Sequence, residues 1–366
     1  MKIGILGTRG IPNHYGGFEQ FAQYLSVGLV ARGHEVYVYN SSLHPYQEPE
    51  YHGVKLIHCE DTEDKMGTAG QFIYDFNCFK DARRRPFDLL LQLGYTSSSV
   101  WYWMWPKKMV NMVNMDGLEW KRSKYSPKVQ WFLKHAERWA AKHGDVLIAD
   151  SLGIQTHLQE TYRKPSIFIP YGAELFDMPR ANVLSTYGVQ PYQYHLLIAR
   201  MEPENNIEMI IKGYLQSQSP FPLMIVGKTD NKFGQYLRDT YTDNRLRFVG
   251  GIYDMGIINN LRHYSQLYFH GHSVGGTNPS LLEAMAADCL IAAHDNVFNQ
   301  TVLQENAFYF GSPEAVTTIL DQVQDKNEYR NLIEANRQRI TTAYNWEKII
   351  DAYEAAMLEA VKKKKG

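Results

Sequence analysis

The sequence predicts two doubly wound α/β domains in tandem, and three observations lead to this prediction. The chain has 366 residues, which is more than one hydrophobic core usually organises. Short apolar runs of strand length alternate with segments of helical periodicity, as in parallel α/β sheets. This alternation fades around residues 175–191 and then starts again. We therefore expect a ligand-binding cleft between the two domains, at the carboxyl ends of their strands.

The first domain is expected to begin with a buried strand at residues 3–6, a glycine-rich loop and a helix. The helical pattern runs from Phe18 to Leu29 and stops at Gly33. Further strands are expected at residues 36–39, 54–57, 89–91, 109–113, 146–149 and 167–169 in the first domain, and at 196–199, 223–226, 246–249, 267–269 and 290–293 in the second. The predicted domains are residues 1–172 and 173–344, with a helix at 345–366 that packs back on the first domain.

The composition argues against several classes of protein. A net charge of -1 and an isoelectric point near 6.9 argue against a nucleic-acid-binding protein. Cys59, Cys78 and Cys289 are far apart and lack metal-ligand spacing, so we expect buried thiols, a reducing compartment and neither zinc nor disulfides. We also expect no cofactor and no metal. No apolar run approaches twenty residues and the chain opens directly on a strand, which predicts a cytoplasmic protein that spans no membrane.

Residues 271–285 combine two glycines, a helix start and one acidic side chain. Pro279 suits the first turn of a helix, and a helix start with free amides binds anions such as a diphosphate. Glu283 follows one turn later on an otherwise apolar helix and needs a partner, such as a sugar hydroxyl or a buried amide. The alternative is a capped core helix whose glutamate reaches solvent. The other candidate ligand-binding residues of this segment are His272, Gly275, Gly276, Thr277, Asn278 and Ser280, of which Thr277 or Asn278 can cap the helix.

Two cations follow strands of the second domain. Arg200 comes directly after the strand at 196–199, and its planar guanidinium suits a phosphate. The alternative is a salt bridge with Glu202 or Glu204. Lys228 follows the next strand in a Gly-Lys pair, so a second cation can reach the same place.

Several of these segments together resemble the retaining GT4 glycosyltransferases. The resemblance rests on Arg200 with the following Pro-Glu-Asn, on the helix of residues 275–285 and on the closing Tyr344-Asn345-Trp346. Residues 7–12, 15–19 and 116–122 resemble the branch of bacterial polysaccharide rhamnosyltransferases, whose amino-terminal domain is of the DUF1972 type.

The resemblance implies a GT-B fold, in which two Rossmann-like domains face an interdomain cleft. It also implies a nucleotide diphosphate sugar as donor, often dTDP-L-rhamnose, a lipid-linked glycan as acceptor at the inner face of the membrane, and no metal. The chain departs from the wider family at two positions. Gly275 stands where many members have a glutamate, so His272 or backbone amides are candidates for its role. Asn205 stands where many have a lysine, so Lys228 or Arg9 are candidates to replace that charge.

The loop of residues 7–18 is the candidate acceptor or phosphate loop. Gly16 and Gly17 at a helix start let backbone amides approach a ligand closely, and Arg9 adds charge beside them. The alternative is a tight turn with a solvated arginine.

Three residues that follow strands are the catalytic candidates. Asp116 is placed to accept the proton of an incoming hydroxyl. In a front-face ion-pair route the departing phosphate oxygen takes that proton, and Asp116 would instead orient the acceptor. Asp150 and Tyr171 are candidates for holding the acceptor; the alternatives are a helix cap for Asp150 and interdomain packing for Tyr171.

Aromatic and basic residues gather at 101–105 and 120–142. Such a face suits an anionic membrane surface or a lipid diphosphate, which predicts peripheral attachment to the inner face of the plasma membrane. The alternative is a solvated helix whose aromatic residues pack inward.

The glycine pattern after the first strand does not fit a dinucleotide-binding enzyme. Gly4, Gly7 and Gly10 follow the first strand, but their spacing is not that of a dinucleotide-binding fingerprint, and the second strand ends at Tyr39-Asn40 without an acid. An NAD-dependent oxidoreductase is therefore disfavoured. A hexosyltransferase that uses a UDP- or GDP-sugar and a non-catalytic nucleotide-sugar or glycan binder stay open.

Overall fold

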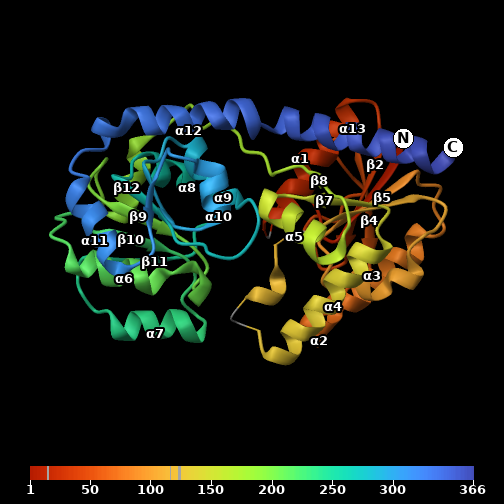
Figure 1. Cartoon of the computed structure of the whole chain (residues 1–366), viewed down its shortest axis with the longest axis horizontal. Coiled ribbons are helices and arrows are strands. Elements are labelled where there is room, and N and C mark those ends of the chain that lie inside the picture. Colours follow the sequence, from red (N-terminus) through yellow and green to blue (C-terminus); the bar gives the residue numbers. More distant parts are fainter. Residues whose placement is uncertain (15, 116, 123–124) are drawn as a thin grey trace. The chain divides into compact units, whose positions relative to one another are not determined.

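The computed structural model describes residues 1–14, 16–115, 117–122 and 125–366, and these form two compact units. Unit 1 takes its residues from the ranges 1–121, 125–171 and 346–366, and unit 2 consists of residues 172–345 together with Arg122. Each unit is a mainly parallel sheet with helices packed around it (Figure 1). The chain therefore passes from unit 1 into unit 2 and returns to unit 1 with one helix.

The sheet of unit 1 has the strand order β3-β4-β2-β1-β5-β6-β7-β8. Its strands are β1 (Lys2–Leu6), β2 (Glu35–Ser41), β3 (Glu50–Tyr51), β4 (Val54–Cys59), β5 (Leu89–Leu93), β6 (Val110–Asn114), β7 (Val146–Ala149) and β8 (Ile167–Phe168). Neighbouring strands are parallel, except for the antiparallel pair β3 and β4. All residues of β5 and β6 are buried, because helices cover both faces of the sheet.

The helices of unit 1 connect these strands. They are α1 (Gly17–Ala31), α2 (Glu63–Met66), α3 (Thr68–Ala82), α4 (Pro127–His143), α5 (Leu152–Tyr162) and α13 (Trp346–Lys365), with short 3-10 segments η1 (Ser99–Met104) and η2 (Glu119–Lys121). Within the described residues, no helix combines the length and the hydropathy that crossing a bilayer requires.

Helix α13 joins unit 1 through its contact with α1. The ring of Trp346 stacks on Tyr24 with centroids 4.5 Å apart, and Tyr353 contacts Phe21 at 5.2 Å. At the other end of α13, Lys364 pairs with Asp145. Composition alone suggests that the run Lys362 to Lys365 is a solvated tail. In the structure it belongs to α13, and Lys365 also pairs with Asp88.

The sheet of unit 2 is wholly parallel, with the order β11-β10-β9-β12-β13-β14. Its strands are β9 (His195–Ile198), β10 (Leu223–Val226), β11 (Leu246–Gly250), β12 (Leu267–His270), β13 (Ile291–His294) and β14 (Phe308–Phe310). Its helices are α6 (Ile207–Gln216), α7 (Lys232–Thr240), α8 (Met255–His263), α9 (Pro279–Ala286), α10 (Val297–Leu303), α11 (Pro313–Gln322) and α12 (Arg330–Ala343), with 3-10 segments η3 (Ala181–Tyr187), η4 (Pro203–Asn205) and η5 (Lys326–Tyr329).

The predicted fold class is confirmed, since two doubly wound parallel sheets follow one another along the chain. Every strand predicted from an apolar run is present, with ends that differ by at most two residues. Two short strands, β3 and β14, were not predicted. All three cysteines are free, buried thiols.

Candidate functional site

The strand order of unit 2 places a candidate ligand site at one point of its sheet. Counted along the chain, its strands lie in the order 3-2-1-4-5-6, and the direction of progression reverses between β9 and β12. In open parallel sheets, ligands bind at the carboxyl ends of the strands beside such a reversal, because the two adjoining loops diverge there. These loops are residues 199–206 after β9 and residues 271–278 after β12.

Hydrogen bonds join these two loops. The amide and hydroxyl of Ser273 both donate to the carbonyl of Glu204, at 3.1 and 2.8 Å, and the side-chain amide of Asn206 donates to the carbonyl of Gly271 at 2.7 Å. A Cβ at Gly271 would lie 2.0 Å from the carbonyl oxygen of Asn205, so this close approach needs a glycine. The loops therefore form one rigid edge.

Asn278 caps helix α9. Its side-chain oxygen accepts from the amide of Ser280 at 2.9 Å, and its carbonyl accepts from the amides of Leu281 and Leu282. The predicted cap is thus confirmed at Asn278. However, these three amides at the start of the helix already donate to Asn278. An anion would therefore have to bind to the amides of the preceding turn. There the amides of Gly275 and Gly276 donate to no acceptor among the described residues.

Gly275 shapes this turn. Its φ of +135° lies in the region that side chains rarely adopt, and nothing lies within 4 Å of the position of a Cβ. Thr277 beside it is buried. The turn lines a small hollow together with His272, Ser273, Val274, Asn278, Phe298 and Asn299. The hollow has about 10 Å³ of free volume, room for about one water molecule, so a larger ligand would lie at its mouth.

Glu283 has a partner that the sequence did not indicate. Its carboxylate oxygen Oε2 lies 2.7 Å from the guanidinium of Arg262, a residue of α8 whose side chain is only 2% exposed. The same guanidinium donates to the hydroxyl of Ser280 at 2.9 Å, and that hydroxyl lies 3.1 Å from the hydroxyl of Tyr268. Burial would lower the pKa of Arg262, but Glu283 raises it above its usual value. The sequence contains little indication of this role, because Arg262 lies in the last turn of a helix, where cations are usually solvated.

The two predicted cations of unit 2 have different surroundings. Arg200 is exposed and lies near His272, where burial and then the Arg200 cation lower the pKa of the imidazole to about 3. Lys228 is exposed and its ammonium lies over the ring of Tyr253, 5.5 Å from the centroid. The structure thus brings Arg200 and His272 together, while Lys228 follows the neighbouring strand β10.

The loop after β1 is held in place by neighbouring polar groups. The guanidinium of Arg9 makes two hydrogen bonds to Glu63, at 2.9 and 2.6 Å, and its amide donates to Glu19 at 2.8 Å. Asn40 is bound to the backbone of Ile11 through both ends of its side-chain amide. The predicted phosphate-loop charge is therefore compensated by a carboxylate. Helix α1 begins at Gly17 with Gly16 as its N-cap and without a side-chain cap.

The catalytic candidates lie in unit 1. Asp116 lies outside the described residues. Asp150 is buried. Burial, and then the charge of Asp150, raise the pKa of Tyr353, whose hydroxyl accepts from Asn114 at 3.1 Å. The helix that follows is capped by Ser151 and not by Asp150. Tyr171 is buried and packs edge-on against Phe21 of α1 at 5.3 Å.

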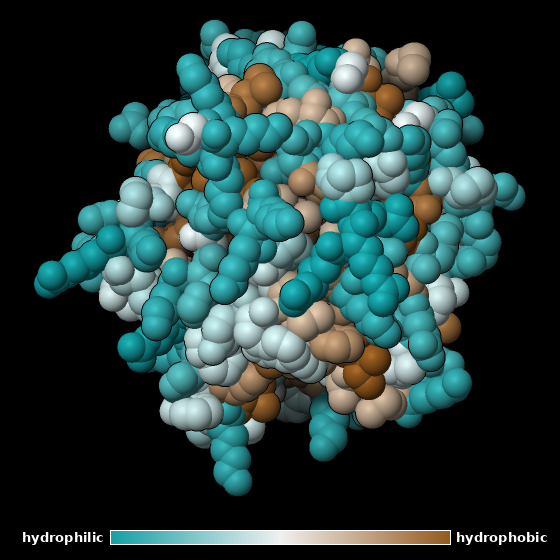
Figure 2. All heavy atoms as spheres, turned by 90° about the vertical axis from the view of Figure 1, so that its right-hand side faces the viewer, coloured by the Kyte–Doolittle hydropathy of each residue, from teal (hydrophilic) through white to brown (hydrophobic). Residues whose placement is uncertain are grey.

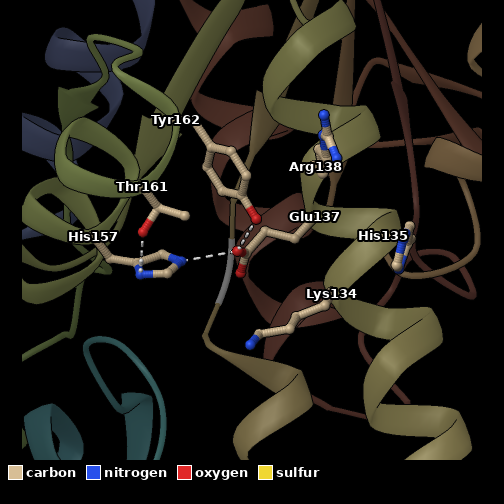
Figure 3. A pocket seen from close by; sticks show the side chains of 7 residues that line it. All are labelled: Lys134, His135, Glu137, Arg138, His157, Thr161 and Tyr162. Carbon is tan, nitrogen blue, oxygen red and sulfur yellow. Dashed lines mark hydrogen bonds and ion pairs between the residues drawn. The ribbon is translucent and has the colours of Figure 1, made fainter.

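A cluster around Glu137 of α4 was missed by sequence reasoning. His157 and Tyr162 of α5 bind its oxygen Oε1 at 2.8 and 2.7 Å, as Figure 3 shows. Trp120 and Tyr95 bind Oε2 at 3.0 and 3.3 Å. Burial would raise the pKa of Glu137, but the hydrogen bonds from His157 and Tyr162 hold it below its usual value. The carboxylate therefore ties η2 and the loop after β5 to α4 and α5.

A cavity of about 240 Å³ adjoins this cluster. It is lined by Lys134, His135, Glu137, Arg138, His157, Thr161 and Tyr162 (Figure 3). The ammonium of Lys134 lies 4.4 Å from the centre of the Trp120 ring, and the Thr161 hydroxyl lies 3.2 Å from His157 Nδ1.

Aromatic rings cover the side of unit 1 formed by η1 and α4. Tyr102 stacks on His143, and Trp131 contacts His135 with ring centres 4.0 Å apart. Trp103 and Trp131 are 57% and 64% exposed, so part of this aromatic surface faces solvent. The exposed cations of α4 are Lys128, Lys134, Arg138 and Lys142. Figure 2 views the molecule from the side of unit 1 and shows apolar residues in separate spots among hydrophilic ones.

Residues 98–174 match a protein family described as a domain of unknown function (DUF1972). The matched segment includes η1, α4, α5 and most of the residues around Glu137. The expected DUF1972 resemblance is thus confirmed over that segment. A search of curated protein sequences found no match.

Solved structures resemble nearly the whole chain. A sucrose-phosphate synthase from Thermosynechococcus elongatus is 16% identical with a TM-score of 0.77, and the match covers 98% of both chains. Anabaena HepE in complex with UDP and glucose is 16% identical with a TM-score of 0.77, over 98% of this chain and 100% of that one. An α,α-trehalose 6-phosphate synthase from Burkholderia multivorans is 12% identical with a TM-score of 0.71, over 99% and 97%. These matches confirm the predicted GT-B fold with its two Rossmann-like units.

Proposed function

We propose that this protein is a glycosyltransferase whose nucleotide diphosphate sugar binds at the carboxyl edge of the unit 2 sheet. One observation carries the proposal: the joined loops after β9 and β12 bring an exposed guanidinium, Arg200, to the same edge as the amides of Gly275 and Gly276. A guanidinium and converging amides are the groups that bind a diphosphate. HepE, which shares the fold, has been solved with UDP and with UDP-glucose, which supports this assignment.

The carboxylate of Glu283 is positioned to bind a neutral part of the same ligand. Its carboxylate is oriented by the buried Arg262, which in turn is held by Ser280. A carboxylate fixed in this way can accept hydrogen bonds from the ribose hydroxyls without first losing side-chain freedom.

The donor that we propose is dTDP-L-rhamnose, and the acceptor is a lipid-linked glycan of bacterial surface polysaccharide, with retention of configuration at the anomeric carbon. The resemblance of residues 7–12, 15–19 and 116–122 to the rhamnosyltransferase branch of the GT4 family is the basis of this assignment. A UDP-hexose is the second candidate donor, because the HepE complexes contain UDP and UDP-glucose.

The proposed mechanism assigns charge stabilisation to unit 2. Arg200 and the glycine amides stabilise the diphosphate as the glycosidic oxygen departs, and Lys228 supplies further positive charge from the next strand. The proton of the acceptor hydroxyl passes to the departing phosphate oxygen or to Asp116. Asp150 and Tyr171 are the remaining candidates for holding the acceptor, and Arg9, Gly16 and Gly17 line its loop.

Thermal melts with dTDP, UDP, GDP and NAD test donor binding. A nucleotide at a hundred times its Kd stabilises the folded state by about 2.7 kcal/mol, which is a measurable shift in Tm. We expect a shift with dTDP or UDP that Arg200→Ala reduces and that Arg238→Ala, a change at an exposed arginine of α7, leaves intact. A shift with NAD alone would contradict the proposal.

Donor turnover separates a transferase from a non-catalytic binder. Incubation with dTDP-L-rhamnose or UDP-glucose should release the nucleoside diphosphate, and with a glycan acceptor added, NMR of the glycoside formed reports whether the configuration of the sugar is retained. Asp116→Asn should keep donor affinity and lower turnover. If that variant keeps full activity, the base role passes to the phosphate oxygen, and Asp150 and Tyr171 become the next residues to vary.

The aromatic surface of η1 and α4 is proposed to attach the protein to an anionic bilayer that carries the acceptor. Exposed tryptophans beside lysines favour the interface of such membranes. Co-sedimentation with phosphatidylglycerol vesicles should fall when Trp131 is changed to Ser, and should weaken with added salt. Absence of any salt-sensitive binding to the anionic vesicles would contradict the proposal and leave only a soluble acceptor or a lipid held through its sugar.

A further inference from the structure

Two histidines stand where β12 meets the candidate donor site. His270 ends the strand and is 1% exposed, and His272 lines the hollow beside Gly275. Their rings stack with centroids 4.5 Å apart and planes 17° apart. The main-chain oxygen of His272 accepts from the side-chain amides of Asn296 and Asn299, both at 3.0 Å. The position of the pair is therefore fixed by its neighbours.

Three ring nitrogens of this pair lack a partner. Both nitrogens of His270 and Nδ1 of His272 are buried and make no hydrogen bond with any described residue. A buried polar atom without a partner costs free energy, and native proteins rarely leave several together. Such a group points to a ligand or an ordered water that the chain itself does not supply.

The pair differs chemically from the nearby arginine. Burial, followed by the charge of Arg200, lowers the pKa of His272 to about 3, and burial, followed by the charge of His272, lowers that of His270. Both rings are therefore neutral near pH 7. A neutral imidazole offers one donor and one acceptor, which matches a hydroxyl group, and it offers no positive charge to a phosphate.

We propose that His272, held in place by its stacking on His270, recognises hydroxyl groups of the donor's sugar, while Arg200 and the glycine amides bind the diphosphate. His272 lines the hollow and contacts the sugar, and His270 is a positioning residue that holds the ring of His272 through stacking. This inference rests on the proposed function and makes it more specific, because it assigns sugar discrimination to unit 2 residues of the β12 edge.

Isothermal titration of the full chain with four ligands tests whether His272 binds the sugar while Arg200 and the glycine amides bind the diphosphate. The ligands are UDP, UDP-glucose, dTDP and dTDP-L-rhamnose. His272→Ala should weaken the bound nucleotide sugar about tenfold, the loss expected for one or two hydrogen bonds, and should change the affinity for the matching nucleoside diphosphate less than about twofold. His272→Gln, which keeps a donor and an acceptor, should recover part of the loss.

Two further variants complete the test. His270→Phe preserves the stack and should cause a smaller loss than His272→Ala, again only for the nucleotide sugar. His135→Ala in unit 1 is the matched control and should behave like the wild type, with a melting curve for every variant to show that it is folded.

The outcomes separate the inference from the proposed function. An equal loss of nucleotide and nucleotide sugar, or no loss of either, would overturn the role of the pair while leaving donor binding established. If the wild type binds none of the four ligands, the proposed donor site itself is wrong, and the inference falls with it.

Discussion

The guanidinium of Arg262 is almost wholly buried, and Glu283, Ser280 and Asn259 all bind it. Sequence reasoning predicted that Glu283 needs a partner, because a carboxylate within an apolar helix cannot stay unpaired. It could not identify Arg262, because the two residues meet only through the packing of α8 on α9. His272 was a predicted ligand-binding residue, but its stacking on His270 was not predictable, since a histidine at the end of an apolar strand has no local signature of its partners.

Removing Arg262 should be strongly destabilising for unit 2. Arg262→Met keeps much of the side-chain volume but removes a buried guanidinium from the carboxylate of Glu283, whose side chain is only 16% exposed, which should cost about 3–5 kcal/mol. Urea denaturation followed by circular dichroism measures the loss. The double variant Arg262→Met with Glu283→Leu should recover part of the stability, and Arg238→Met should cost almost nothing. Equal stability of the single variant and the wild type would mean that the pair does not hold α8 to α9.

Helices and strands were predictable where apolar periodicity is strong. The central strands β1, β5 and β9 each contain an apolar run of at least three residues, and the predicted ends differ from the observed ones by at most two residues. The unpredicted β3 and β14 have two and three residues, too few to show a period. The cap of α9 was predictable from Asn278 before Pro279, but the use of its amides within the chain was not.

Helix α3 carries a buried acid that should make the stability of unit 1 depend on pH. Burial raises the pKa of Asp75 to about 7, a hydrogen bond from Ser97 opposes this shift, and Oδ2 has no partner among the residues described. The unfolded chain loses this proton near pH 4 and the folded chain near pH 7. Stability therefore falls as pH rises from about 4 to about 7, by no more than about 4 kcal/mol, and is constant above.

Asp75→Asn should remove this dependence. The variant should gain stability over the wild type at pH 8 and much less at pH 5. All seven tryptophans belong to unit 1, so their fluorescence in urea reports this unit alone. Asp64→Asn, at an exposed position of α2, is the control. A stability difference that is the same at both pH values would show that Asp75 ionises normally.

At the scale of the whole molecule, each unit has a hydrophobic core of its own. Leu90, Val113 and Phe79 belong to the cluster of unit 1, and Leu197, Ile225 and Phe269 to that of unit 2. The restart of the α/β pattern in the sequence predicted this division into two sheets. Unit 2 is nearly continuous in sequence, whereas unit 1 needs α13, which buries Trp346, Tyr353 and Met357.

This difference predicts unequal behaviour of two truncated proteins. The fragment 172–345 should unfold cooperatively by circular dichroism and should bind the same nucleotide as the full chain. The protein 1–345, which lacks α13, should lose much of the stability of unit 1, since α1 would expose Phe21 and Tyr24. Tryptophan fluorescence in urea measures this loss. An unchanged midpoint for 1–345 would show that α13 contributes nothing to the stability of unit 1.

The return of α13 to unit 1 also sets an order of events during synthesis on the ribosome. Unit 1 lacks part of its core until α13 leaves the exit tunnel, and by then residues 172–345 have all been translated. At about 5–20 residues per second that interval is on the order of ten seconds or more. Unit 2 can therefore reach its native state before unit 1. Until α13 packs on it, the apolar surface of α1 stays exposed and accessible to chaperones.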